Sequence, residues 1–371
     1  MATPSSGVIK FTDIENEFGQ ATNRSIGSYV SDAWDYGDYE APLDRGPEGG
    51  TSTPTVKSNV KFSDFYNREL NVVADFYSGS AENRQDAHTR YNATSDVVGP
   101  AGSAYGNGSQ SPPSNGGGKR VIISINKSIG SEKTDDSGAG DAGEQKVALK
   151  TGDGWTSGTE LFIHVGNNGR IAGAGGDAGS GAGRADGTAG KNATSGLGIQ
   201  WEGTVVTAIN NGKITTGYPG GGGGGGSWAE REERWRGPRK SIAGSGGGGG
   251  AGLPAGNGGT GGASGTAATL EERGLGGAST SNTSEGYGVH GGAGGDGAEA
   301  SHSAGNGGGG WTSGNTENTD NKSGGAAGQG LGAAIRKTSG SISWTFGTGH
   351  VTNNVVGEGK DGSGESPTGV A

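Results

Sequence analysis

The sequence contains no cysteine, a single methionine and few apolar residues, which make up 28% of its 371 residues. The absence of cysteine excludes disulfides and thiolate metal sites. No run approaches the roughly 18 consecutive apolar residues of a membrane-spanning helix, and Met1 to Gly7 does not have the pattern of a signal peptide. With so little apolar material, one conventional hydrophobic core is not expected to serve the whole chain.

The common catalytic motifs are missing as well. There is no GxSxG nucleophile elbow and no GxxxxGK[ST] phosphate loop, and the five histidines show no HExxH spacing. A pair of carboxylates for glycan cleavage remains an alternative, because Asp and Glu occur throughout the chain. Gly291 to Glu299 matches a calcium-binding nonapeptide loosely, but without the tandem copies that such sites need. We therefore expect no enzyme, no cofactor and no metal site.

Positively charged residues are also fewer than negatively charged ones. The chain has 28 Lys and Arg against 38 Asp and Glu, which gives a net charge of −10. This acidic balance argues against a surface for nucleic acid or anionic membrane.

Glycine, in contrast, is abundant, with 87 residues that are densest between Gly217 and Gly310. In NGGTGGASG and HGGAGGDG, glycine fills two of every three positions. A threefold helix with glycine on two of its three edges can lie directly against neighbouring helices and bond to them through its backbone. The alternative is a flexible linker, but the aromatic residues Trp228, Trp235, Tyr287 and Trp311 interrupt this segment. The sequence therefore predicts a polyglycine II sandwich in a mostly β chain.

Residues 1–80 have ordinary aromatic and aliphatic content and contain an internal repeat. The segment 8–16 (VIKFTDIEN) matches the segment 59–67 (NVKFSDFYN). Ser63 reads as a helix N-cap, which predicts a helix through residues 68–74. We expect a small α+β attachment module here, followed by a linker rich in Gly, Ser and Pro over residues 81–119.

Residues 120–216 have a sequence pattern typical of β-strands, and we expect strands at 121–125, 146–150 and 161–165. Residues 165–171 and 209–214 each contain Asn-Gly between β-prone residues, which is a strong turn signal. Both segments lead into a glycine run, so the sequence predicts two units with the order strand, Asn-Gly turn, short strand and glycine run. The glycine-rich body is assigned to residues 217–330. Residues 331–371 are expected to form a β-hairpin, made of 341–346 and 351–356, and a polar tail.

Several of these segments resemble proteins of tailed bacteriophages. VIKFTDIENEFG followed by SIGSYV resembles the short module at the start of many fibre and tail-tip proteins. ELFIHVGNNGRI and GTVVTAINNGKI, alternating with glycine runs, resemble the distal region of glycine-rich tail fibres, and Gly324 to Trp344 is the most specific piece. The glycine runs are similar to the tip adhesins of T-even-like phages, in which polyglycine helices pack as a sandwich and their loops recognise the host. Those adhesins have a different N-terminal domain, so their mode of attachment does not carry over.

The resemblance implies a virion protein that attaches to other tail proteins through residues 1–80. Its loops would bind a host surface receptor, either lipopolysaccharide or an outer-membrane protein. It also implies a homotrimer, although a single chain that caps another fibre is compatible. Two alternatives stay open: a purely structural connector or decoration protein, and an ice-binding polyglycine protein, which the charged insertion after Trp228 disfavours.

The insertion from Trp228 to Lys240 is the strongest candidate site, because Trp and Arg dominate the energetics of many interfaces and Trp stacks on sugar rings. As a helix it would place Trp228 and Trp235 on one face. The competing interpretation is that these Trp side chains cover the glycine scaffold. The receptor-binding candidates are Trp228, Arg231, Arg234, Trp235, Arg236, Trp155, Trp311, Tyr218 and Tyr287. The attachment candidates are Phe11, Ile14, Phe62, Phe65 and Tyr66.

Overall fold

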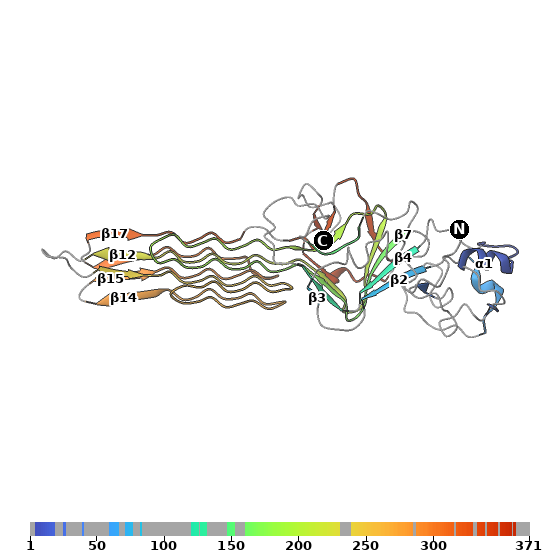
Figure 1. The fold of residues 1–371 in the computed structure, drawn as a ribbon, viewed down its shortest axis with the longest axis horizontal. Helices are drawn as coiled ribbons and strands as arrows, with labels where there is room; N and C mark the ends of the chain where they lie inside the picture. Colours follow the sequence, from blue (N-terminus) through green and yellow to red (C-terminus); the bar gives the residue numbers. More distant parts are fainter. Residues whose placement is uncertain are drawn as a thin grey trace, which may run out of the picture.

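The computed structural model describes residues 4–18, 25–26, 39–40, 59–66, 71–76, 82–83, 120–125, 127–131, 147–152, 160–230, 239–284, 287–314, 317–328, 332–337, 340–347, 349–357 and 359–360. Over these residues the protein is mostly β, and its helical elements are α1 (Phe11–Phe18) and the 3-10 turns η2 (Phe62–Phe65) and η3 (Thr352–Asn354), with Ile26 also in 3-10 conformation. The molecule is elongated, with α1 near one extremity, short hairpins at the other and larger sheets between them (Figure 1).

Three sheets form the middle of the molecule. Their strand orders are β1-β2-β4-β7-β10-β19, β20-β11-β8-β5-β3 and β21-β18-β9-β6, and every neighbouring pair is parallel except β1 with β2. The strands are β1 (Tyr39–Glu40), β2 (Asn71–Phe76), β3 (Glu82–Asn83), β4 (Arg120–Ile125), β5 (Ser128–Gly130), β6 (Val147–Lys150), β7 (Glu160–Val165), β8 (Arg170–Ala172), β9 (Ser195–Ile199), β10 (Thr204–Ala208), β11 (Lys213–Thr215), β18 (Ile335–Lys337), β19 (Trp344–Phe346), β20 (Val355–Val356) and β21 (Gly359–Lys360).

The chain order shows that these sheets are the three sides of a parallel coil. One turn is β4, β5 and β6, the next is β7, β8 and β9, and two more are β10, β11 and β18, then β19, β20 and β21. Because equivalent strands stack in parallel, their apolar side chains align inside the coil. In the second sheet the stack is Ile129, Ile171, Ile214 and Val355, all of them buried. This interior is the main hydrophobic core.

Asparagine and glycine make the corners between the first two sheets. Gly169 and Gly212 each donate a backbone hydrogen bond of 2.8 Å to the residue three positions earlier, which closes a tight turn. Corners of successive turns are then joined, since Asn211 Nδ2 donates to Asn167 Oδ1 at 3.0 Å. The predicted order of strand, Asn-Gly turn, short strand and glycine run is therefore confirmed, and the two units pair with each other in parallel.

The glycine-rich runs leave the coil at the same corner in two successive turns. Residues 173–194 run outward and back between β8 and β9, and residues 217–328 make four further round trips between β11 and β18. Within the run 217–226, donors meet the same neighbour every third residue: the N–H groups of Gly221 and Gly224 bond to the carbonyls of Gly248 and Ser245. The intervening donors bond to the runs 185–194 and 304–310.

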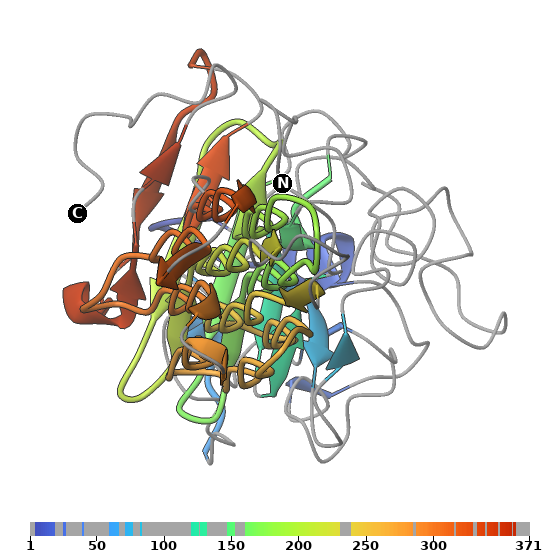
Figure 2. The same ribbon diagram turned by 90° about the vertical axis from the view of Figure 1, so that its left-hand side faces the viewer.

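These hydrogen bonds define three layers. One outer layer holds the runs 185–194, 173–183 and 255–262, the middle layer holds 322–328, 217–226, 243–252 and 263–269, and the other outer layer holds 304–310, 291–298 and 274–278. Figure 2, which looks along the long axis, shows the runs as stacked coils. The runs 217–226 and 243–252 are bonded to neighbours on all sides, and an added Cβ at their glycines would collide with the backbone of a neighbouring run.

Two expectations about regular structure are wrong. Residues 71–74 belong to β2, which pairs with β4 over six residue pairs, and not to a helix through residues 68–74. Pairing to the parallel sheet overrides the weak helical pattern of a segment that carries two adjacent valines, which favour strands. The C-terminal hairpin is also absent: β19 pairs with β10 and β20 with β11, because this segment is one more turn of the coil.

The internal repeat near the N-terminus is present in the structure. In both copies an Asp side chain accepts the backbone N–H three residues earlier, Asp13 from Lys10 at 2.8 Å and Asp64 from Lys61 at 2.7 Å. The copies pack together through an edge-to-face contact between Phe11 and Phe62, with ring centroids 6.3 Å apart. The two segments therefore share this Asp hydrogen bond and pack against each other, although the first continues as the α-helix α1 and the second as the short 3-10 turn η2.

Candidate functional site

Six short strands form two small antiparallel sheets at the extremity farthest from α1 (Figure 1). We call this region the hairpin end. Its strands are β12 (Ser227–Glu230), β13 (Arg239–Ile242), β14 (Thr280–Ser284), β15 (Tyr287–Gly291), β16 (Trp311–Gly314) and β17 (Glu317–Asn321). Each pair of strands continues two glycine-rich runs, so the scaffold sets the position of the hairpins.

A small apolar cluster joins the two sheets. It contains Ala229, Tyr287 and Val289, with Ile242 packed against them. The buried Lys240 lies above the Tyr287 ring, with Nζ 4.0 Å from the ring centroid, and also donates to the Tyr287 carbonyl at 3.3 Å. A buried cation over an aromatic face stabilises this arrangement. Tyr287 therefore supports the hairpin end from within.

Trp311 lies on the outside of the sheet formed by β14, β15 and β16. It is 45% exposed. One face of its indole is stacked on His290 with ring centroids 4.7 Å apart and planes 3° apart. His290 Nε2 in turn lies 3.0 Å from the Ser313 hydroxyl. A large aromatic side chain is thus held in place while much of its surface stays open to solvent.

Trp228 is less accessible. It lies on β12 and is half-buried, with the Arg184 guanidinium carbon 5.5 Å from its ring centroid. Arg184 comes from the turn that joins the runs 173–183 and 185–194. The ends of the Trp228 insertion are the antiparallel strands β12 and β13, so its helical interpretation is wrong at both ends. Strand pairing at this point follows from the two antiparallel runs that the insertion connects.

The predicted receptor-binding residues are only partly brought together. Trp228, Tyr287 and Trp311 share the hairpin end, whereas Tyr218 lies at the opposite end of the run 217–226. The remaining candidates lie outside the described residues: Trp155, Arg231, Arg234, Trp235 and Arg236.

Sequence reasoning missed His290 and Arg184, which contact the two Trp rings. The signal for His290 was present, because YGVHG and WTSG alternate residues as strands do and both border glycine runs. Their register, with His290 opposite Trp311, depends on pairing between segments separated by the run 291–310. Arg184 is a lone charged residue in a turn, and nothing in the local sequence connects it to Trp228.

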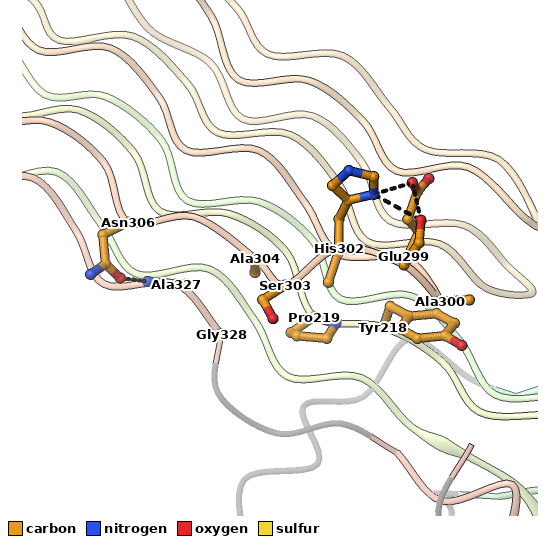
Figure 3. A pocket seen from close by; sticks show the side chains of 12 residues that line it. Tyr218, Pro219, Glu299, Ala300, His302, Ser303, Ala304, Asn306, Ala327 and Gly328 are labelled. Atoms are coloured by element: carbon orange, nitrogen blue, oxygen red, sulfur yellow. Dashed lines mark hydrogen bonds and ion pairs between the residues drawn. The ribbon is translucent and has the colours of Figure 1, made fainter.

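A pocket of about 530 Å³ lies at the other end of the glycine-rich body, beside the coil. Figure 3 shows Tyr218, Pro219 and the turn residues Glu299 to Ser303 around it. Gly222 and Gly225 donate to Gly305 and Gly308, but Pro219, three residues earlier in the same series, has no N–H to donate. The scaffold therefore ends here without leaving a backbone donor unpaired at this position. Burial raises the pKa of Tyr218.

Ionic contacts surround this end of the body. Glu299 accepts hydrogen bonds from the Arg273 backbone N–H and guanidinium, both at 3.0 Å, and lies 2.7 Å from His302 Nδ1. The backbone hydrogen bond from Arg273 is the largest cause that lowers the pKa of the Glu299 carboxyl. Nearby, Arg170 of β8 contacts Glu271 at 2.8 Å. These contacts connect the turns of the glycine-rich body to each other and to the coil.

We expect the Glu271→Gln variant to lose a small amount of stability at neutral pH and none in acid. The hydrogen bond from Arg170 lowers the pKa of Glu271 in the folded state, so its contribution is present above the ordinary pKa of about 4.3 and is lost as pH falls through the lowered value. The Glu271 side chain is 61% exposed, so the difference should stay under about 1 kcal/mol. Urea unfolding at pH 7 and pH 3 measures it, with Glu272→Gln as control; a difference that grows in acid would contradict this assignment.

The attachment candidates lie together at the α1 extremity. Ile14 and Phe65 are buried, Phe11 and Tyr66 are half-buried, and Phe62 is 41% exposed. The Tyr66 hydroxyl donates to the Gly7 carbonyl, which fixes the second copy of the repeat against the first. Ile14 and Phe65 therefore hold the unit together, and Phe62 is the member of this set with an open surface.

Some kinds of site are not found in the part of the chain that the structure describes. No three His, Cys, Asp or Glu side chains there are grouped as metal ligands. The helical segments described there are too short to cross a membrane.

No protein-family model matches this chain, and no curated protein matches it. Among solved structures, the crystal structure of the gp37-gp38 adhesin tip complex of the bacteriophage S16 long tail fiber matches with a TM-score of 0.32 and 18% identity, covering 81% of this chain and 87% of that one. The function of this chain rests on its own geometry.

Proposed function

We propose that this protein is a receptor-binding component of a phage tail fibre, in which the glycine-rich body presents the hairpin end to the host-cell surface. The observation that carries the proposal is the exposed Trp311 on a short strand at one extremity of an elongated molecule. The attachment candidates lie at the other extremity. An elongated protein with different surfaces at its two ends suits a link between a tail and a cell.

The runs of the body are proposed to be polyglycine II helices packed as a sandwich. The support is the period of three: along the run 217–226, successive N–H groups point to three different neighbours, and each neighbour recurs at every third residue. Three residues per turn without internal hydrogen bonds is the geometry of this helix type. A lattice bonded in this way is rigid, so the hairpins lose little entropy when they bind.

Residues 1–80 are proposed to dock on another tail protein. Val8, 81% exposed, and Phe62 lie in the repeat unit and give it apolar surface. The backbone hydrogen bonds around both central runs are made within one chain, which favours a single capping chain over the predicted homotrimer. We propose binding without catalysis, on a virion tail, to lipopolysaccharide or an outer-membrane protein.

The absence of cysteine gives a direct test of this arrangement. Ser281→Cys on β14, coupled to a large maleimide polymer, should lower adsorption of the purified protein to susceptible bacteria by about tenfold or more, because the polymer covers the hairpin end. A tenfold loss corresponds to about 1.4 kcal/mol of binding free energy. The measurement is the fraction of labelled protein that sediments with cells.

Val8→Cys with the same polymer is the matched control at the opposite extremity. It should leave adsorption of the purified protein unchanged and block its incorporation into tails. Equal adsorption of both labelled proteins would favour a structural connector over a receptor-binding protein.

A further inference from the structure

The outer face of the β14-β15-β16 sheet has a defined arrangement of side chains. Directly opposite residues in antiparallel strands point to the same face. One row is Ser281, His290 and Trp311, and another is Thr283, Gly288 and Ser313. Val289, between the two rows, points to the buried cluster on the other face. The outer face therefore combines an aromatic pair with three hydroxyl groups.

The aromatic pair is fixed before any ligand arrives. The His290 ring covers one face of Trp311, with centroids 4.7 Å apart, and is itself held by Ser313. The Ser227 hydroxyl donates to the His290 carbonyl at 2.9 Å, which ties this strand to β12. An indole with one face supported and the other accessible is a preorganised stacking surface.

Three side chains pack closely over the backbone at Gly288. A Cβ at this position would lie 2.6 Å from Thr283 Cγ2, 3.0 Å from Ser313 Oγ and 3.2 Å from His290 Nε2, so glycine is what lets these side chains approach the sheet. The hydroxyl-bearing side chains of Thr283 and Ser313 therefore border the Gly288 position on this face. Hydroxyls both donate and accept hydrogen bonds, which suits a ligand that carries many hydroxyls of its own.

The absence of charged residues from these strands also limits the class of ligand. The segments TSNTS, YGVHG and WTSG, which form β14, β15 and β16, contain no Asp, Glu, Lys or Arg. A phosphate or a carboxylate would find no Arg or Lys on these strands to pair with. A neutral ring with an apolar face and hydroxyls at its edge matches what the strands present.

We propose that this face binds a neutral pyranose unit of a bacterial surface polysaccharide. The ring stacks on the open face of Trp311, and its hydroxyls bond to Ser281, Thr283 and Ser313. Trp228 lies on β12 of the neighbouring sheet and Arg184 in a turn beside it, and neither contacts the sugar. This inference rests on the proposed receptor-binding function and assigns its ligand class.

The test uses the full-length protein and bacteria to which it adsorbs. Periodate, which cleaves sugar diols, should abolish adsorption, and protease treatment of the cells should leave it intact. The polysaccharide released from the same cells should bind the protein by calorimetry, with Trp311→Ala losing at least about tenfold in affinity and Trp311→Phe losing less. Phe346→Ala is the matched control, because it removes an aromatic ring that is also stacked on a histidine, His350, with centroids 3.8 Å apart, but lies on β19 of the coil. This variant should bind as the unaltered protein does.

Two results would overturn the sugar assignment. One is polysaccharide binding that is equal in Trp311→Ala and the unaltered protein, provided that both show the same thermal unfolding midpoint. The other is adsorption that protease removes and periodate does not, which would make the receptor a protein. In either case, blocking by the polymer at Ser281 would still support the hairpin end as the receptor site, whereas failure of that block would refute the receptor-binding function itself.

Discussion

Replacing Gly221 with alanine should destabilise the glycine-rich body by about 3 kcal/mol, the upper end of what overpacking usually costs. An added Cβ would lie closer than 3.0 Å to the carbonyl oxygens of Gly295 and Asp296. Both are backbone atoms in a neighbouring run that is itself bonded on several sides, so they have little room to move. The midpoint of thermal unfolding should fall by roughly 6–12 °C, at about 2–4 °C per kcal/mol for a body of this size.

Gly183→Ala provides the matched control. Gly183 lies in the turn at the end of the run 173–183, and an added Cβ there has no atom within 4 Å. This variant should unfold close to the temperature of the unaltered protein. If Gly221→Ala and Gly183→Ala had the same small effect, close backbone packing could not be what requires glycine in the central runs.

Replacing Ile171 with alanine should destabilise the coil by about 2–5 kcal/mol, the usual range for a buried Ile→Ala change. Ile171 is fully buried and stands between Ile129 and Ile214 in the stack of the second sheet. Its neighbours are fixed by parallel pairing on both sides, so the cavity can collapse only partly. Urea unfolding followed by far-ultraviolet circular dichroism measures the loss.

Leu275→Ala is the control for this change, because Leu275 is a comparable aliphatic residue that is 54% exposed. It should change the free energy of unfolding by no more than about 0.5 kcal/mol. A small effect at Ile171 would mean that the three sheets do not enclose a shared core.

The strands and turns of this fold could be predicted from the sequence more readily than the segments with which they pair. The strands near residues 121–125, 147–150 and 161–165, the Asn-Gly corners and the glycine runs all carry short-range signals. The parallel coil carries none, because its pairs join segments up to 141 residues apart, such as Ile214 with Val355. For the same reason residues 341–346 and 351–356 were expected to pair with each other.

At the candidate site, too, single residues could be identified from the sequence, but their contacts could not. An aromatic residue that interrupts a glycine-rich segment is visible in the sequence, so Trp228 and Trp311 could be singled out. The different environments of the two Trp residues could not be predicted. The stacking of His290 on Trp311 and the position of Arg184 over Trp228 both depend on contacts between segments that are separate in the sequence. Tyr218 has a comparable sequence context to Tyr287, but the direction of its run places it at the other end of the body.

The central claim is that a rigid glycine-rich body holds a receptor-binding surface at its hairpin end. Hydrogen exchange measured by mass spectrometry, with and without envelope material from adsorbing bacteria, tests both parts together. Amides of the runs 217–226 and 243–252 should exchange slowly in both samples, and binding should add protection over residues 280–284, 287–291 and 311–314. Rapid exchange throughout the central runs, or added protection at the Tyr218 pocket or α1 in place of the hairpins, would contradict the account.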